Sequence, residues 1–342
     1  MRPTTLVALL ACLSLAACGS EERGSSGSSS GGSSAEQGAF PVTIEHKHGS
    51  TTIEKAPKRI VVVGLREQDA LLALGVVPVA TTEWYGEYPG AVFPWAKDEL
   101  GSGKVPEVLD DTDGVEIEKV AAQQPDLILG VYSGITAKEY KSLSKLAPVV
   151  AQPKGKPDFG TSWQEETLIS GQAVGKEAEA QKLVDETEKL VADTAAENPD
   201  LKGKTAALVS DYQGVFVYGP KDVRSRLLVE LGMKYPEALL DAFPNEFGGQ
   251  LSDEKTDALD VDVLVWFADG DRSKADLKKD PLYSKLSVNK EERDVFIGGK
   301  DRVYDSTSFV SVLSMPTLMK EFVPRLAAAA DGDPSTSTDQ QG

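Results

Sequence analysis

The chain has 342 residues, of which 40% are apolar and 26% are charged, and its formal net charge is −18. This length suffices for one large hydrophobic core or two ordinary ones. This excess of acidic residues argues against nucleic acid as a partner, because nucleic-acid binding relies on clustered Lys and Arg. It argues against electrostatic docking on anionic lipid for the same reason. With 2 Cys and 2 His, a disulfide scaffold is excluded and a Cys/His zinc site is disfavoured.

Residues 1–18 are typical of a secretion signal. Arg2 precedes an apolar run over 6–17, which is too short for a membrane-spanning helix because such a helix needs about 20 residues. The run ends in Leu-Ala-Ala-Cys at 15–18, which resembles the lipobox of bacterial lipoproteins. In that class the signal peptide is removed before the cysteine, whose sulfur then carries a lipid. The resemblance implies lipidation of Cys18 and a protein anchored to the extracytoplasmic face of the cell membrane.

Residues 19–39 are predicted to be a flexible linker. Fourteen of the twenty residues over 19–38 are Gly or Ser, and such a segment cannot bury a core. A coil of this length has an end-to-end distance of about 25 Å, so it would tether a folded body near a membrane. At the other end of the chain, residues 331–342 are rich in Pro, Ser, Thr and Asp and are predicted to be a disordered tail.

Residues 40–161 are predicted to form an α/β lobe. Two short segments around His48 and Gly49 suggest a hairpin over 42–53. The rest alternates between continuous apolar runs, typical of strands buried on both faces of a parallel sheet, and segments with helical spacing. The expected strands are 59–64, 76–80, 126–131 and 149–151, and the expected helices are 67–74, 117–124 and 139–146.

Residues 163–197 are predicted to be mostly helical, with a division at Gly175. The alternating pattern then restarts and predicts a second α/β lobe over 177–330. Two α/β lobes joined once by helix are the simplest assembly of these elements. The expected strands of the second lobe are 205–210, 261–267 and 295–297, and its expected helices are 226–231 and 312–326.

The candidate ligand-binding residues follow the predicted strands, because ligands of open α/β sheets lie beyond the carboxyl ends of the strands. Aromatic side chains with polar tips gather in these loops and suit a large ligand that is partly apolar and partly charged. Arginine adds planar donors for carboxylate or catecholate oxygen. The candidates are Arg66, Trp84, Tyr85, Trp95, Tyr132, Ser133, Tyr212, Tyr218, Arg224, Arg226, Trp266 and Tyr304.

Several candidates have an equally simple structural explanation. Trp266 ends an apolar strand and fits a core position, and Trp95 fits a plug beneath a loop. Arg224 could pair with the neighbouring Asp222. Arg66 is different, because a cation at the start of a helix opposes the helix dipole, and this local conflict favours a functional role.

Several motifs resemble the iron–siderophore and cobalamin class of ABC-transporter substrate-binding proteins. They are residues 59–66 with 70–75, 118–120 with 124–128, 132–136, 280–283 and 313–316. The resemblance covers residues 40–329 and is closest to the ferric-siderophore lipoproteins of Gram-positive and actinobacterial type. It implies two Rossmann-like lobes joined by a single backbone helix within 162–176, a ligand cleft between the lobes, and binding without catalysis.

The same resemblance implies the partners. The ligand would be an Fe³⁺–siderophore complex, with no intrinsic cofactor, and a loaded monomer would dock on a membrane permease driven by an ATPase. Family members dock through one exposed Glu on each lobe, and the matching positions are Glu118 and Glu254. A hexadentate chelator needs no iron ligand from the protein, whereas a tetradentate one could take a phenolate from Tyr304 or Tyr218. The siderophore class, whether hydroxamate, catecholate or carboxylate, stays open.

Other functions fit the sequence less well. Haem is the alternative ligand within the same fold, with a Tyr as its iron ligand. A zinc or manganese receptor is disfavoured because His46 and His48 lie in a terminal hairpin and no other His follows. A hydrolase is disfavoured because there is no Gly-x-Ser-x-Gly elbow and neither His suits a triad. A purely structural lipoprotein would not explain aromatic residues gathered at strand ends.

Overall fold

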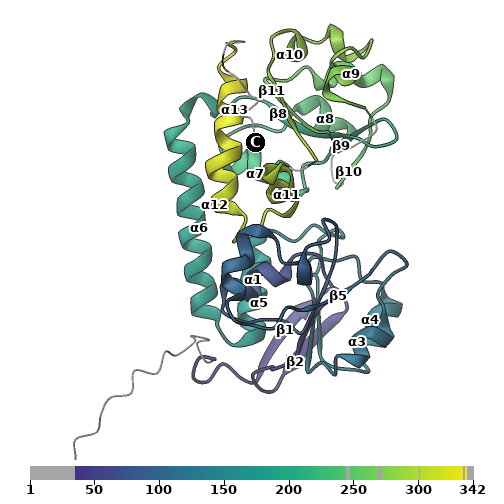
Figure 1. Cartoon of the computed structure of the whole chain (residues 1–342), viewed down its shortest axis with the longest axis vertical. Coiled ribbons are helices and arrows are strands. Elements are labelled where there is room, and N and C mark those ends of the chain that lie inside the picture. Colours follow the sequence, from purple (N-terminus) through teal and green to yellow (C-terminus); the bar gives the residue numbers. More distant parts are fainter. Residues whose placement is uncertain (1–34, 244–246, 269–271, 300, 334–335, 337–342) are drawn as a thin grey trace, which may run out of the picture. The chain divides into compact units, whose positions relative to one another are not determined.

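A computed structural model describes residues 35–243, 247–268, 272–299, 301–333 and 336. These residues contain two five-stranded sheets and a separate two-stranded hairpin (Figure 1). The predicted signal peptide, Cys18 and most of the predicted linker lie outside the described residues, as does most of the predicted tail. Within the described ranges, no helix combines the length and the apolar character that crossing a membrane would need.

The first sheet is entirely parallel, with strand order β5-β4-β3-β6-β7. A separate apolar cluster packs on each of its two faces, and its inner strands are therefore continuous apolar runs rather than alternating ones. Its strands are β3 (Ile60–Val62), β4 (Ala80–Thr82), β5 (Glu107–Leu109), β6 (Leu127–Gly130) and β7 (Val149–Ala151). The helices of this lobe are α1 (Glu67–Ala73), α2 (Lys97–Leu100), α3 (Ile117–Ala122) and α4 (Ala137–Leu143).

The second sheet has the order β10-β9-β8-β11-β12 and is mixed, because β9 runs antiparallel to both of its neighbours. Apolar clusters again cover both faces. Its strands are β8 (Ala206–Asp211), β9 (Val215–Tyr218), β10 (Gly248–Gln250), β11 (Val263–Phe267) and β12 (Asp294–Ile297). The helices are α7 (Val223–Glu230), α8 (Glu237–Ala242), α9 (Lys274–Lys278), α10 (Ser287–Lys290), α11 (Arg302–Phe309), α12 (Met315–Thr317) and α13 (Val323–Ala330).

The lobes are connected by two consecutive helices. α5 (Trp163–Val174) packs on α1 of the first lobe, and α6 (Glu177–Glu197) contributes to both lobes (Figure 1). Ala180 of α6 belongs to the core of the first lobe, and Val191 belongs to that of the second. α5 also contributes to both cores, through Trp163 in the second and Ala173 in the first, and the interlobe helix expected within 162–176 stays a prediction. A helix of 21 residues spans about 30 Å, which suffices to reach from one core to the other.

The predicted hairpin is present as β1 (Val42–His46) and β2 (Gly49–Ile53), paired antiparallel. Just before it, Glu36 is tied to the junction of α5 and α6. Its backbone N–H donates to the carbonyl of Gly175 at 2.7 Å, and its carboxylate accepts from the N–H of Ala178 at 2.9 Å. Because the first N–H groups of a helix have no partner within it, Glu36 caps α6. The final residues of the segment predicted as a linker thus contact the folded body.

The elements differ from the sequence prediction in several places, among them α7, which begins at Val223 rather than 226, and α8 and α11, which were not predicted. β4 begins at Ala80 rather than 76, because the chain is still turning out of α1 at Val76, whose N–H donates to the carbonyl of Leu71. The closing helix begins at Met315 and is π-helical over 318–322, just before Pro324, which has no N–H for the regular ladder. The short strands β5, β9 and β10 were not predicted, because three or four residues carry little periodicity.

Candidate ligand-binding site

A cleft of about 340 Å³ opens where β8 ends. Trp84 lies after β4 in the first lobe, and the other lining residues belong to the second lobe, so the cleft lies between the lobes. Most of its lining side chains are aromatic, and Tyr212 is 64% exposed, which leaves a ring free to meet a ligand. The lining residues are Trp84, Ser210, Asp211, Tyr212, Phe216, Tyr218, Arg224 and Phe247.

Among the described residues that line this cleft, Arg224 is the one basic residue, and it is 3% exposed. Its Nε and Nη2 atoms donate to the two carboxylate oxygens of Asp222, at 2.7 and 2.8 Å. Its guanidinium lies 3.8 Å from the ring centroid of Tyr218. Burial lowers the pKa of Arg224, but Asp222 and Tyr218 outweigh burial and hold the pKa above its usual value. The charge of this arginine is thus matched by a buried carboxylate and covered by a ring.

Asp211 is the acidic residue of the lining, and it is also paired. Its Oδ1 accepts from Nε and Nη2 of Arg272, at 2.9 and 2.6 Å. Arg272 in turn donates to Asp280 at 3.0 Å. Each charged side chain among the described lining residues therefore has an opposite charge in direct contact.

The loop after β4 reaches across to α11 of the second lobe. The hydroxyl of Tyr85 donates to the backbone carbonyl of Asp305 at 3.1 Å, and that of Tyr88 donates to its carboxylate at 2.8 Å. The ring of Tyr85 packs edge-on against Trp84 and Tyr304. Tyr85 and Tyr304 therefore lie beside the cleft and support its wall without being among the residues that line it.

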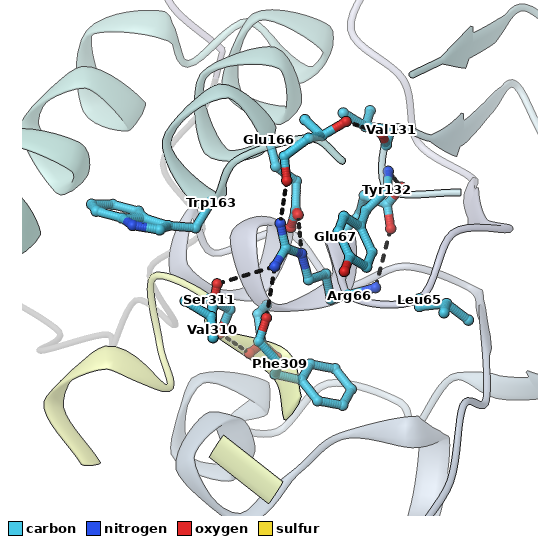
Figure 2. Close-up of polar contacts among 12 residues, drawn as sticks. Leu65, Arg66, Glu67, Val131, Tyr132, Trp163, Glu166, Phe309, Val310 and Ser311 are labelled. Carbon is cyan, nitrogen blue, oxygen red and sulfur yellow. Dashed lines mark hydrogen bonds and ion pairs between the residues drawn. The ribbon is translucent and has the colours of Figure 1, made fainter. Parts of the chain in front are cut away.

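Arg66 is completely buried at the seam of the two lobes (Figure 2). Its Nε donates to Glu166 of α5 at 2.5 Å, Nη2 donates to the carbonyl of Thr161 at 2.8 Å, and Nη1 donates to the carbonyl of Phe309 at 2.7 Å. The guanidinium lies 3.7 Å from the ring centroid of Tyr132. The structure thus places Arg66 outside the cleft, because its donors are already used between the two lobes.

Glu67 holds the loop around Arg66 in place. Its carboxylate accepts from the backbone N–H of Tyr132 at 2.8 Å and from that of Arg66 at 3.2 Å. The same carboxylate lies against Gly64, where an added Cβ would come within 2.1 Å of Glu67 Oε1. A side chain at position 64 would displace the carboxylate of Glu67, so the glycine lets this acid connect the ends of β3 and β6.

Two buried carboxyl groups of the seam have shifted pKa values. Burial raises the pKa of Glu166 above its ordinary value, although Arg66 opposes that rise. Burial also raises the pKa of Asp69 to about 6, against hydrogen bonds from Ser311 and from Trp95 Nε1, the latter at 2.7 Å. Both carboxyl groups therefore lie in surroundings that disfavour their charged forms.

The structure brings four of the twelve candidates into the cleft lining: Trp84, Tyr212, Tyr218 and Arg224. Ser133 is buried and donates to the carbonyl of Gly130 at 2.7 Å, close to Tyr132 in the seam. Trp95 is held by Asp69 as described above. Arg226 donates to the carbonyl of Gly160 at 3.2 Å and is not among the lining residues. Ligand binding by the twelve residues stays a prediction.

Trp266 lies on the other face of the second sheet. It packs against Tyr283 and Phe296 in the outer apolar cluster and is 1% exposed. It borders a separate hollow of about 450 Å³ that is lined by Arg272 and Tyr283 among others. The core explanation of Trp266 therefore agrees with its position, and its role in ligand binding stays a prediction.

Four lining residues escaped the sequence analysis: Ser210, Asp211, Phe216 and Phe247. Phe216 had a usable signal, since it lies two residues before Tyr218 in the same strand and alternate residues of a strand share a face. Phe247 carries no comparable signal, because it comes from a segment between α8 and β10 without periodicity.

The two predicted docking carboxylates are both exposed. Glu118 lies in α3, directly before β6, and Glu254 lies in the 3₁₀ helix over Asp253–Leu259, before β11. No set of three or more His, Cys, Asp or Glu side chains able to hold a metal occurs within the described ranges. Direct iron ligation by Tyr218 or Tyr304 stays a prediction.

Two α/β lobes joined by two consecutive helices, with an aromatic cleft at their boundary, define a bilobal ligand-binding protein. The family described as periplasmic binding protein matches residues 60–300. The chain therefore belongs to this family, whose members bind and release ligands rather than catalyse reactions.

Similarity extends over most of the chain. The Bacillus subtilis protein YfiY, named a probable siderophore-binding lipoprotein, is 30% identical over 87% of this chain and 89% of its own length. The Escherichia coli Fe(3+) dicitrate-binding periplasmic protein FecB is 28% identical over 60% of this chain and 65% of its own length. The structure of Streptococcus pneumoniae PiaA in complex with ferrichrome has a TM-score of 0.75 and 28% identity, covering 85% of this chain and 99% of that chain.

Proposed function

We propose that this chain is the extracytoplasmic binding lipoprotein of an ABC importer that captures a ferric siderophore between its two lobes. The observation that carries the proposal is the aromatic cleft, to which Trp84 of the first lobe and Tyr218 of the second both contribute. Relatives named for siderophore, ferric dicitrate and ferrichrome binding support the same cargo class.

Binding would follow from the shape and polarity of the cleft. The rings of Trp84, Tyr212 and Phe216 would contact the organic part of the chelator, and Arg224 would face its iron-binding oxygens from beneath Tyr218. The chelator itself supplies the oxygen ligands of Fe³⁺, so the cleft needs no metal-binding cluster.

Delivery would use surfaces away from the cleft lining. We propose that Glu118 and Glu254, one on each lobe, meet cationic pockets of a permease whose transport is driven by an ATPase. A lipid on Cys18 would hold the protein at the membrane, and the Gly/Ser-rich segment would let it move between solution-facing and permease-bound positions. Since a single chain supplies both lobes, we propose that it acts as a monomer.

The test is a titration of the full-length chain, purified in mild detergent, against a panel of ferric siderophores, with iron-free chelators and haemin as controls. Trp84 lines the cleft, so an occupied site quenches tryptophan fluorescence. Saturable quenching by a ferric chelate, and none by its iron-free form, is the expected result. Quenching by haemin alone moves the protein to haem uptake, and no response across the panel rejects the proposed function.

A further inference from the structure

A site that binds anions usually offers positive charge without a carboxylate partner, and the described lining of the cleft offers none. Its basic residue, Arg224, gives two hydrogen bonds to Asp222, and its acidic residue, Asp211, accepts two from Arg272. No lysine is among the described lining residues. The described lining therefore brings one positive and one negative group, each already neutralised by its partner.

The arginines near the cleft do not change this balance. Arg66 is fully buried and paired with Glu166 at the seam. Arg226 donates a hydrogen bond from Nη2 to the carbonyl of Gly160 and is not among the residues that line the cleft. Arg224 bonds Asp222 through Nε and Nη2, so Nη1 can still face a ligand, but the buried carboxylate of Asp222 already compensates its positive charge. An anionic ligand therefore gains less from Arg224 than it would from an arginine without a carboxylate partner.

The net charge of the whole chain also disfavours an anionic ligand. The whole chain has a formal charge of −18, which repels an approaching anion and leaves a neutral ligand unaffected. The aromatic faces of Trp84, Tyr212, Phe216 and Phe247 offer contact to hydrocarbon and attract a cation. These side chains favour a ligand with little or no negative charge.

We propose that the preferred cargo is a ferric chelate of zero or positive net charge, of the tris(hydroxamate) class, rather than a multiply anionic tris(catecholate) or citrate complex. Three hydroxamates neutralise Fe³⁺ completely, whereas three catecholates leave a trianion. The inference rests on the proposed function and narrows it, because the relatives of this chain include both ferrichrome and ferric dicitrate binders.

The experiment compares dissociation constants of the full-length chain for four ferric chelates by calorimetry. Three are forms of one linear trihydroxamate that differ only at its terminal amine, which is free, acetylated or succinylated, so that the net charge falls from positive through zero to negative. The fourth is a trianionic tris(catecholate). We expect the neutral form to bind at least about 100-fold more tightly than the trianion, and the succinylated form to be the weakest of the three hydroxamates.

A pair of variants isolates charge from shape. Tyr212→Lys adds an unpaired cation at an exposed lining position, and Tyr212→Gln removes the same ring without adding charge. Relative to Tyr212→Gln, we expect Tyr212→Lys to bind the trianion about 3- to 10-fold more tightly and the neutral chelate equally well. The gain should fade as the salt concentration rises.

The possible outcomes distinguish a failure of the charge inference from a failure of the proposed function. Binding of the trianion as tight as, or tighter than, that of the neutral hydroxamate overturns the charge inference and leaves the proposed function intact. An absence of binding by all four chelates rejects the proposed function itself. Equal trianion affinity in the two Tyr212 variants also counts against the charge inference, because it shows that charge at the cleft does not select the ligand.

Discussion

Arg66 and Arg224 look alike in the sequence, yet the structure uses them in opposite ways. Each lies at or near the beginning of a helix in its own lobe, α1 for Arg66 and α7 for Arg224. Each stacks on a tyrosine and pairs with one carboxylate. Arg66, however, bonds to groups from both sides of the seam, whereas Arg224 bonds within α7 and lines the cleft.

The difference lies in where the partner carboxylate comes from. Asp222 is two residues from Arg224 and caps the same helix, so their pair is complete within one lobe. Glu166 lies a hundred residues from Arg66, on α5, and the other acceptors of Arg66 are the carbonyl of Thr161 and the segment around Phe309. A local pair leaves the surrounding rings free for a ligand, whereas a long-range pair joins parts of the chain together.

The largest effect should come from breaking the seam pair. Arg66→Met leaves the carboxyl group of Glu166 buried without its cation, and we expect a loss of about 3–5 kcal/mol in the free energy of unfolding. Urea denaturation at neutral pH measures it. The double variant Arg66→Met, Glu166→Leu serves as the control and should recover most of the loss, because apolar pairs replace buried ion pairs well. A single variant as stable as the parent would contradict the role of Arg66 as a tie.

The second effect depends on pH. The carboxyl group of Asp69 titrates near 6 in the folded chain and near its ordinary value, below 4, when unfolded. Because the folded state holds the proton more tightly, its contribution to stability is present at low pH and is lost as the pH rises through 6. Compared with Asp69→Asn, the parent should lose about 3 kcal/mol between pH 4 and 7. A stability difference that is constant across this range would refute the prediction.

A smaller effect on ligand affinity should distinguish a tryptophan of the cleft from one on the outer face of the second sheet. Trp84 lines the cleft and Trp266 lies in the outer cluster, although the sequence made both candidates. We expect Trp84→Phe to weaken ferric-siderophore binding about 5-fold, through loss of about 1 kcal/mol of ring contact. Trp266→Phe should lower the thermal midpoint yet change the affinity less than twofold. Equal effects of the two variants on affinity would place the ligand elsewhere.

The smallest effect concerns the exposed carboxylates. Glu118→Gln and Glu254→Gln should leave ligand affinity unchanged, because neither residue lines the cleft. Each should reduce ⁵⁹Fe uptake by cells that depend on this chain about 2- to 5-fold, and more at low salt than at high salt. Glu186→Gln, at an exposed position of α6, is the matched control. Uptake that falls equally in the control would show that the effect is not specific to docking.

The sequence was informative where a local pattern determines the structure. The apolar runs of β3, β6 and β11 and the hairpin β1–β2 were found because burial on both faces, or a turn between short strands, leaves a direct mark on the residues. The restart of the strand–helix alternation in the second half of the chain predicted two lobes, and the resemblance to siderophore-binding proteins implied a ligand cleft between them. The sequence does not show which of the two consecutive helices joins the lobes, because that depends on packing, and both α5 and α6 contribute side chains to the two cores.

The site was harder to predict because burial depends on partners far along the chain. The residues next to Arg66 in the sequence do not indicate that it will bond to Glu166 and to the carbonyl of Phe309. The residues next to Trp266 likewise do not indicate which face of the sheet it will occupy. Tyr212 was recognisable because it directly follows the end of β8, and Tyr218 was a candidate although it belongs to the unpredicted strand β9. Phe247 lacked even that signal.

Because α6 takes part in both cores, the lobes are unable to melt independently. Loss of the second core would strip Val191 of its neighbours and fray the helix whose other end holds Ala180 in the first core. Heating the chain should therefore give a single calorimetric transition, with equal calorimetric and van't Hoff enthalpies, despite the presence of two sheets. In a binding protein built in this way, both lobes unfold together. No partly unfolded form with a single intact lobe then accumulates to hold a ligand.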